Sequence, residues 1–96
     1  MKAWELLDSP EKWCKGTFAK NSSGDHVEIY GEAACQWCVS GAIHKCYEDQ
    51  PFTISVMLKK LQDRAGVRVG AFPGPWNDAP ERTWEEVHSL LKELDI

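Results

Sequence analysis

Apolar and polar positions alternate most regularly over residues 33–47, where apolar side chains recur at steps of three and four. This spacing places side chains on one side of an α-helix. The stripe consists of Cys35, Cys38, Val39, Ala42, Ile43, Cys46 and Tyr47. The pattern therefore predicts a central buried helix over residues 33–47, around which the rest of the chain is arranged.

Two further amphipathic segments carry helix-end signals. Pro51 in the first turn and Gly66 at the C-terminal cap bracket a helix, with an apolar stripe made of Ile54, Met57, Leu58, Leu61 and Ala65. Thr83 and Glu86 form a capping box. It begins a final helix whose inner side carries Trp84, Val87, Leu91 and Leu94.

Short β-branched and aromatic segments at residues 17–20 and 26–30 flank a run of turn-forming residues. This arrangement predicts a β-hairpin, and residues 67–69 are a candidate third strand. Two strands are marginal alone, so the hairpin must pack on helices. The expected fold is a small α+β domain spanning residues 1–96, with the hairpin packed on three to four helices.

Composition narrows the class of protein. The chain has 96 residues, enough for one core, and its 43% hydrophobic and 27% charged residues are typical of a folded protein. The net charge of −4 provides no general attraction to nucleic acid or to an anionic membrane. No apolar run reaches the ~20 residues that span a bilayer. We therefore expect a cytoplasmic protein with no membrane partner and no nucleic-acid partner.

The four cysteines are Cys14, Cys35, Cys38 and Cys46, and the absence of a signal segment favours reduced, buried thiols over disulfides. Cys35 and Cys38 form a C-x-x-C pair, which raises the question of a zinc or redox site. The further candidate ligands, His44 and Cys46, lie on the same predicted helix, and Cys38 and Cys46 are separated by about 12 Å of helical rise. These residues cannot converge on one ion without help from Cys14 or His26. We predict no metal ligands and no cofactor.

A cysteine nucleophile with a histidine base is the enzymatic alternative. Cys38 and His44 point to different sides of the predicted helix, so they cannot form a dyad. His26 or His88 would have to reach Cys38 through the fold. No catalytic residue is assigned, and a non-enzymatic role is favoured.

Gly41 lies in the middle of the predicted helix, where glycine costs about 1 kcal/mol relative to alanine. A helix that contains such a glycine usually needs close approach of another group. We expect that group to be another helix or an indole ring, and a ligand approaching the backbone is the alternative.

An ordered set of motifs resembles a family of short uncharacterised bacterial and phage proteins. The set comprises Trp13 with Gly16, then Cys38 with Gly41 and Ala42, then Trp76, Asn77 and Asp78 followed by a helix that starts at Thr83. The resemblance spans most of the chain and implies no established activity. It does imply that Cys38, Gly41, Trp76, Asn77 and Asp78 belong to one structural or functional unit.

The Trp76–Asn77–Asp78 segment has two interpretations. The simplest is an Asx-turn, in which the Asn and Asp side chains bind their own backbone. In the functional interpretation, Trp76 stacks on a polar ligand while Asn77 and Asp78 hydrogen-bond it.

The sequence thus favours a small non-enzymatic binding or regulatory protein, encoded by a phage or mobile element as the resemblance implies. Its partner is expected to be a protein or a small polar ligand, and a homo-oligomer is left open. The predicted ligand-binding residues are Trp76, Asn77, Asp78, Cys38 and Gly41. The alternative function is a cysteine-dependent enzyme that uses Cys38.

Overall fold

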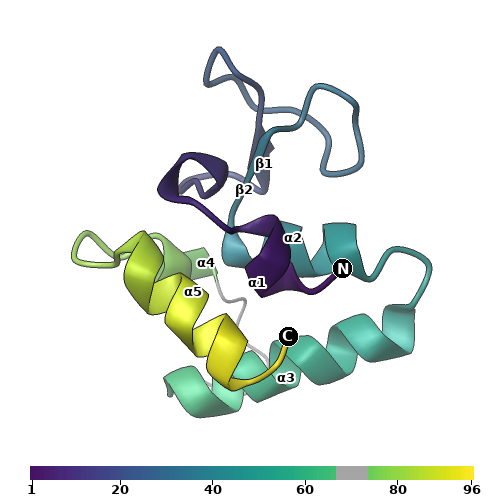
Figure 1. Cartoon of the computed structure of the whole chain (residues 1–96), viewed down its shortest axis with the longest axis vertical. Helices are drawn as coiled ribbons and strands as arrows, with labels where there is room; N and C mark the ends of the chain where they lie inside the picture. The colour runs from purple at the N-terminus through teal and green to yellow at the C-terminus, as the bar shows by residue number, and fades with distance from the viewer. Residues whose placement is uncertain (67–73) are drawn as a thin grey trace.

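The strand pair, the central helix and a long outer helix follow one another across the molecule, with α2 between the other two (Figure 1). This computed structural model describes residues 1–66 and 74–96. Its elements are α1 (Ala3–Leu6), η1 (Pro10–Lys12), β1 (Ala19–Lys20), β2 (Gln36–Trp37), α2 (Val39–Cys46), α3 (Pro51–Ala65), α4 (Gly74–Asn77) and α5 (Trp84–Glu93). The predicted α+β class is confirmed; the candidate strand at residues 67–69 lies outside the described residues.

The core is assembled around α2. Val39, Ala42 and Ile43 on this helix are all 0% exposed. The elements around α2 contribute further fully buried side chains, namely Ala3, Leu7, Ala19, Leu61, Val87, Leu91 and Ile96. The prediction that this helix is the buried centre of the fold is therefore correct, although its length is not.

The central helix starts at Val39, six residues later than predicted, and ends at Cys46. The preceding residues form β2 instead, which pairs antiparallel with β1 through Ala19–Trp37 and Lys20–Gln36. The backbone N–H of Cys38 also donates to the Phe18 carbonyl at 3.1 Å. Residues 36–38 are therefore extended. Residues 18–20 provide the backbone hydrogen bonds that a helix would have provided locally.

The predicted pairing of residues 17–20 with 26–30 is wrong in its partner strand. His26 forms a single isolated bridge with Lys20, whereas the ladder runs between β1 and β2. The turn itself is present, because the Asn21 side chain accepts hydrogen bonds from the backbone N–H groups of Ser23 and Asp25. The antiparallel pair thus encloses a long loop that leaves the helical body (Figure 1).

Both ends of α3 and the start of α5 are as predicted. Gly66 caps α3 in the left-handed conformation with φ 73°. The Thr83 hydroxyl accepts from the Glu86 N–H at 3.3 Å, which is the capping box of α5. Among residues 1–66 and 74–96, no helix has the length and apolarity that crossing a bilayer requires.

Candidate functional site

Asn77 is the centre of a buried hydrogen-bond network that joins three distant parts of the chain. The residue ends α4 and is 0% exposed. Its Oδ1 accepts from the Trp13 indole Nε1 at 2.7 Å and from the Val39 backbone N–H at 3.0 Å. Both of these groups can only donate, so the orientation of the amide is determined by its partners.

The other half of the Asn77 amide is also occupied. Its Nδ2 donates to the Cys14 carbonyl at 3.1 Å and to Asp78 Oδ1 at 2.9 Å. Asp78 Oδ1 in turn accepts from the Gly16 N–H at 3.0 Å. We call these six residues, Trp13, Cys14, Gly16, Val39, Asn77 and Asp78, the Asn77 network. It connects the segment after η1 to α4 and to the first residue of α2.

The Asx-turn interpretation of Asn77 and Asp78 is therefore wrong. Their side chains bind groups that lie 38 to 64 positions away as well as each other. A turn motif satisfies only local backbone. Here the same donor and acceptor types close a tertiary contact.

Cys38 and Gly41 lie at the start of α2, beside this network. Cys38 is the N-cap residue, and its Sγ accepts from the Gly41 N–H at 3.3 Å. A methyl group on Gly41 would overlap the Phe18 carbonyl oxygen and lie 3.1 Å from the Phe18 carbonyl carbon. The close approach predicted at Gly41 is real, but the neighbour is the backbone leading into β1 and not a helix or an indole ring.

The five predicted ligand-binding residues thus fall into two groups. Cys38, Gly41 and Asn77 are buried, and Asp78 uses one carboxylate oxygen inside the network while its side chain is exposed. Trp76 is partly exposed and lines a surface cleft. Of the five, Trp76 is the residue that lines this cleft.

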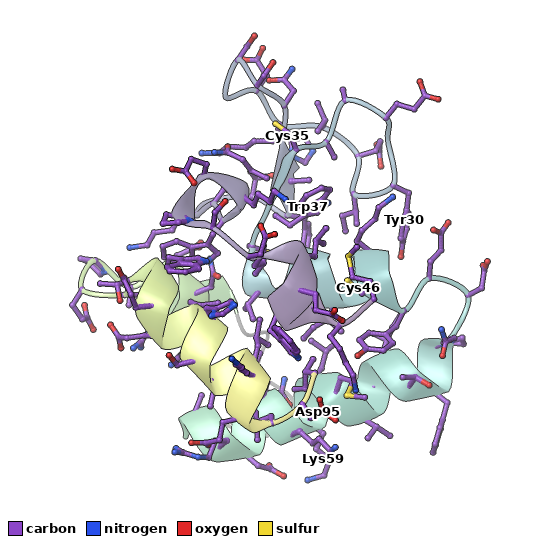
Figure 2. The ribbon with its side chains drawn as sticks, viewed as in Figure 1. Tyr30, Cys35, Trp37, Cys46, Lys59 and Asp95 are labelled. Carbon is purple, nitrogen blue, oxygen red and sulfur yellow. The ribbon has the colours of Figure 1, made fainter. Side chains whose placement is uncertain are left out.

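The four thiols have different environments, and no disulfide joins them. Burial raises the pKa of Cys14 to about 12 and that of Cys46 to about 11. Burial also raises the pKa of Cys38, against the opposing effect of the N–H groups of Gly41 and Ser40. The expectation of buried thiols is wrong for Cys35, which is exposed at the strand pair (Figure 2).

The three histidines have separate partners. His26 Nδ1 contacts the Thr17 hydroxyl, and His44 Nδ1 contacts the Ser40 carbonyl oxygen at 2.9 Å. His88 stacks on Trp84 with ring centroids 4.8 Å apart. Within the described part of the chain, no group of three or more His, Cys, Asp or Glu side chains is placed to hold a metal ion.

The cleft at Trp76 lies between the end of α3 and one side of α5. It has a volume of about 390 Å³ and is lined by Arg64, Ala65, Trp76, Glu86, Ser89, Leu90 and Glu93. Arg64 Nε lies 2.7 Å from Glu93 Oε2 across the cleft. We call this feature the Trp76 cleft.

Arg82 holds the Trp76 side of the cleft in place. Its guanidinium lies 4.3 Å from the centroid of the Trp76 ring, and its Nε donates to the Trp76 carbonyl at 2.9 Å. The same guanidinium binds Glu86 at 2.7 Å and lowers the pKa of that carboxyl. Trp76 is therefore positioned, and Glu86 remains ionised at neutral pH.

Sequence reasoning did not identify Arg64, Arg82 or Glu93 as part of a site. Arg82 and Glu86 are four positions apart just before and within α5, a spacing that could have indicated an ion pair. Arg64 and Glu93 are 29 positions apart, and no local pattern connects them. Trp13 was part of the motif set, but its partner could not be deduced.

A family model described as "Family of unknown function (DUF6197)" matches residues 1–94, so the chain belongs to this family. No curated protein and no solved structure matches it. The family carries no activity that can be transferred to these residues.

Proposed function

We propose that this member of DUF6197 is a non-catalytic binding protein that holds a small, positively charged polar ligand in the Trp76 cleft. The observation that carries the proposal is the cleft itself, an opening of about 390 Å³ bordered by a positioned indole. Sites for small molecules commonly measure roughly 300–1,000 Å³. A regulatory role and phage encoding stay predictions from the sequence.

The lining of the cleft has the composition of a polar binding site. Trp76, Ala65 and Leu90 supply apolar surface, and Ser89 supplies a hydroxyl. Such a mixture buries the flat part of a ligand and orients its polar part. An indole face is also the best aromatic surface for a cation, and the Trp76 ring already holds the Arg82 guanidinium 4.3 Å from its centroid.

Glu93 is the carboxylate of the cleft that a ligand cation would bind. Two carboxylates, Glu86 and Glu93, line the cleft together with the Arg64 guanidinium. Glu86 is already paired with Arg82 at 2.7 Å, with an Arg82 side chain that is mostly buried. The Arg64–Glu93 pair is more than half exposed on both sides. An exposed ion pair contributes little to stability, so a ligand can exchange with one of its members at small cost. A ligand cation that binds Glu93 lies in the same cleft as Trp76 and Glu86.

The Asn77 network supports the wall of the Trp76 cleft, and we assign it no catalytic role. Asn77 holds the end of α4, directly after Trp76, to Trp13 and Val39. A rigid support of this kind keeps a binding residue in place before the ligand arrives.

Three probes of one shape and different charge test the proposal: benzamidinium, benzamide and benzoate. We expect benzamidinium to shift the NMR signals of the Trp76 indole N–H and of the Ser89 and Leu90 amides, with a Kd of about 1–10 mM, as is usual for such small probes. Benzamide should bind more weakly. Benzoate should bind weakest, because the face of an indole ring attracts cations and not anions.

Two glutamate variants provide the matched comparison. Glu93→Gln removes a carboxylate of the cleft and should weaken benzamidinium binding by at least about threefold. Glu85→Gln makes the same change on an exposed residue outside the lining and should leave the Kd unchanged. Equal shifts with all three probes, or shifts spread over other residues, would show that the Trp76 cleft does not select cations.

The competing function, a cysteine-dependent enzyme that uses Cys38, has less support. Cys38 is 4% exposed and burial raises its pKa, whereas a nucleophilic cysteine needs access to substrate and a lowered pKa. Within the described residues, no histidine hydrogen-bonds to its thiol.

Alkylation of the native protein by iodoacetamide distinguishes the two functions. We expect Cys35 to be modified within minutes at pH 7.5. In the native protein, Cys14 and Cys38 should react at least about 100-fold more slowly than Cys35, and they should react readily only after unfolding. Mass spectrometry of each cysteine peptide gives the rates. Rapid modification of native Cys38 below pH 7 would move the nucleophile hypothesis ahead of the binding proposal.

A further inference from the structure

The outer side of α3 carries apolar residues that have no place in the core. Phe52 is 82% exposed and Val56, one turn later, is 37% exposed. Side chains four positions apart lie next to each other on a helix. Leu61, on the opposite side of α3, is 0% exposed. The helix therefore presents an apolar pair to solvent as well as a stripe to the core.

Charged residues of opposite sign flank this pair along the helix. Glu48 and Asp49 are exposed just before α3, and Lys59 and Lys60 are exposed in its second half. The Lys59 side chain points away from the body of the molecule (Figure 2). Acidic residues thus precede the apolar pair in the chain, and Lys59 and Lys60 follow it at helical spacing on the same side of α3. We call the six residues Glu48, Asp49, Phe52, Val56, Lys59 and Lys60 the α3 face.

When a second copy of this surface is rotated by 180°, its basic end faces the acidic end of the first copy. We propose that the α3 face is a docking surface for a second copy of this chain, with the two α3 helices antiparallel about a twofold axis. In one register Phe52 meets the partner's Val56, Glu48 meets the partner's Lys60, and Asp49 meets the partner's Lys59. Each contact occurs twice, as symmetry in such a dimer requires.

The contacts inside each chain allow this pairing. Lys59 binds Asp63 at 2.9 Å, with the two side chains 67% and 53% exposed. Exposed pairs of this type contribute little, so Lys59 can turn to a carboxylate of the other copy. Figure 1 shows α3 along one edge of the molecule, with the rest of the chain on one side of it.

The dimer should be weak. Two apolar side chains per copy, and one helix from each, form an interface at the low end of the range that specific association uses. We therefore expect a Kd of about 10 µM to 1 mM at low salt, which rises as salt screens the four charge contacts.

Charge exchange tests the register by sedimentation velocity of the full chain between about 10 µM and 1 mM. Glu48→Lys alone and Lys60→Glu alone each place like charges opposite one another in the homodimer, and each should weaken self-association by roughly tenfold or more. An equimolar mixture of the two variants restores opposite charges at both positions, so a heterodimer of wild-type affinity is expected. Phe52→Ser should abolish association.

Glu85→Lys is the matched control, because it makes the same charge change on an exposed residue of α5. It should leave the dimer unchanged. A wild-type protein that stays monomeric at 1 mM would overturn the proposal. So would a dimer that ignores Phe52→Ser, or variants whose mixture does not associate better than either alone. All four substitutions are at exposed positions, so loss of folding is not expected, and circular dichroism verifies this.

Discussion

Asn77→Ala should lower the free energy of unfolding by about 3–5 kcal/mol. The substitution leaves the Trp13 indole N–H, the Val39 N–H and the Cys14 carbonyl without their partner. Each buried polar group left unsatisfied costs roughly 1–3 kcal/mol. For a chain of this size the loss corresponds to a decrease of Tm by 15 °C or more, roughly. Thermal unfolding followed by circular dichroism measures it.

Two milder variants show how much of the loss in unfolding free energy is due to the Asn77 amide and how much to its neighbours. Asp78→Asn keeps an oxygen that can accept from both Gly16 and Asn77, so it should cost less than about 1 kcal/mol. Trp13→Phe removes one donor to Asn77 and should cost about 1–2 kcal/mol. If Asn77→Ala were as mild as Asp78→Asn, the network would not be what holds α4 to α2.

Gly41→Ala should destabilise the protein by about 2–4 kcal/mol, although alanine is the better helix former. Helix propensity alone predicts a gain of up to roughly 1 kcal/mol in the first turn of α2. The new methyl group, however, overlaps the Phe18 carbonyl oxygen, which accepts the Cys38 N–H at 3.1 Å. The overlapping group is backbone and cannot rotate away, so β1 must move and strain its ladder with β2. Urea unfolding gives the magnitude.

Ser40→Ala is the control on the same helix. Ser40 is 0% exposed, and its hydroxyl has no hydrogen-bond partner among residues 1–66 and 74–96. Removing an unpartnered buried hydroxyl and adding helix propensity should be neutral or stabilising by up to about 1 kcal/mol. A stabilising effect of Gly41→Ala, similar to that of Ser40→Ala, would contradict the close approach of Phe18.

The outer helices could be predicted because their signals are local. The Thr83–Glu86 capping box and the Gly66 cap involve residues within one turn of the helix end that they define. Amphipathic periodicity supplied the rest of α3 and α5. Local signals of this kind act before any distant contact forms, so they can be deduced from neighbouring residues alone.

The start of α2 was not predictable in the same way. Cys35 and Cys38 fit the predicted helical stripe, yet Gln36 and Trp37 between them pair with Lys20 and Ala19 in a strand ladder. Which of two compatible patterns is adopted depends on a partner strand about 17 positions earlier. Periodicity contains no information about such a partner.

The candidate site shows the same division. The motif set indicated that Cys38, Gly41, Trp76, Asn77 and Asp78 act together, and the Asn77 network connects Asn77 and Asp78 directly to Trp13, Gly16 and the residue after Cys38. The sequence did not reveal that most of this unit is buried. Nor did it reveal the Trp76 cleft, because Arg64 and Glu93 come from different helices.

The sequence by itself determined the fold class, both ends of α3, the start of α5 and the position of the central buried helix α2, since these depend on composition, periodicity and caps. Only the tertiary structure decided which strand pairs with β1, what Asn77 binds and that Trp76 lines a cleft. The physical reason is that hydrogen bonds and steric overlap act at distances of about 3–4 Å. Two residues 60 positions apart come within that range only after the whole chain has packed.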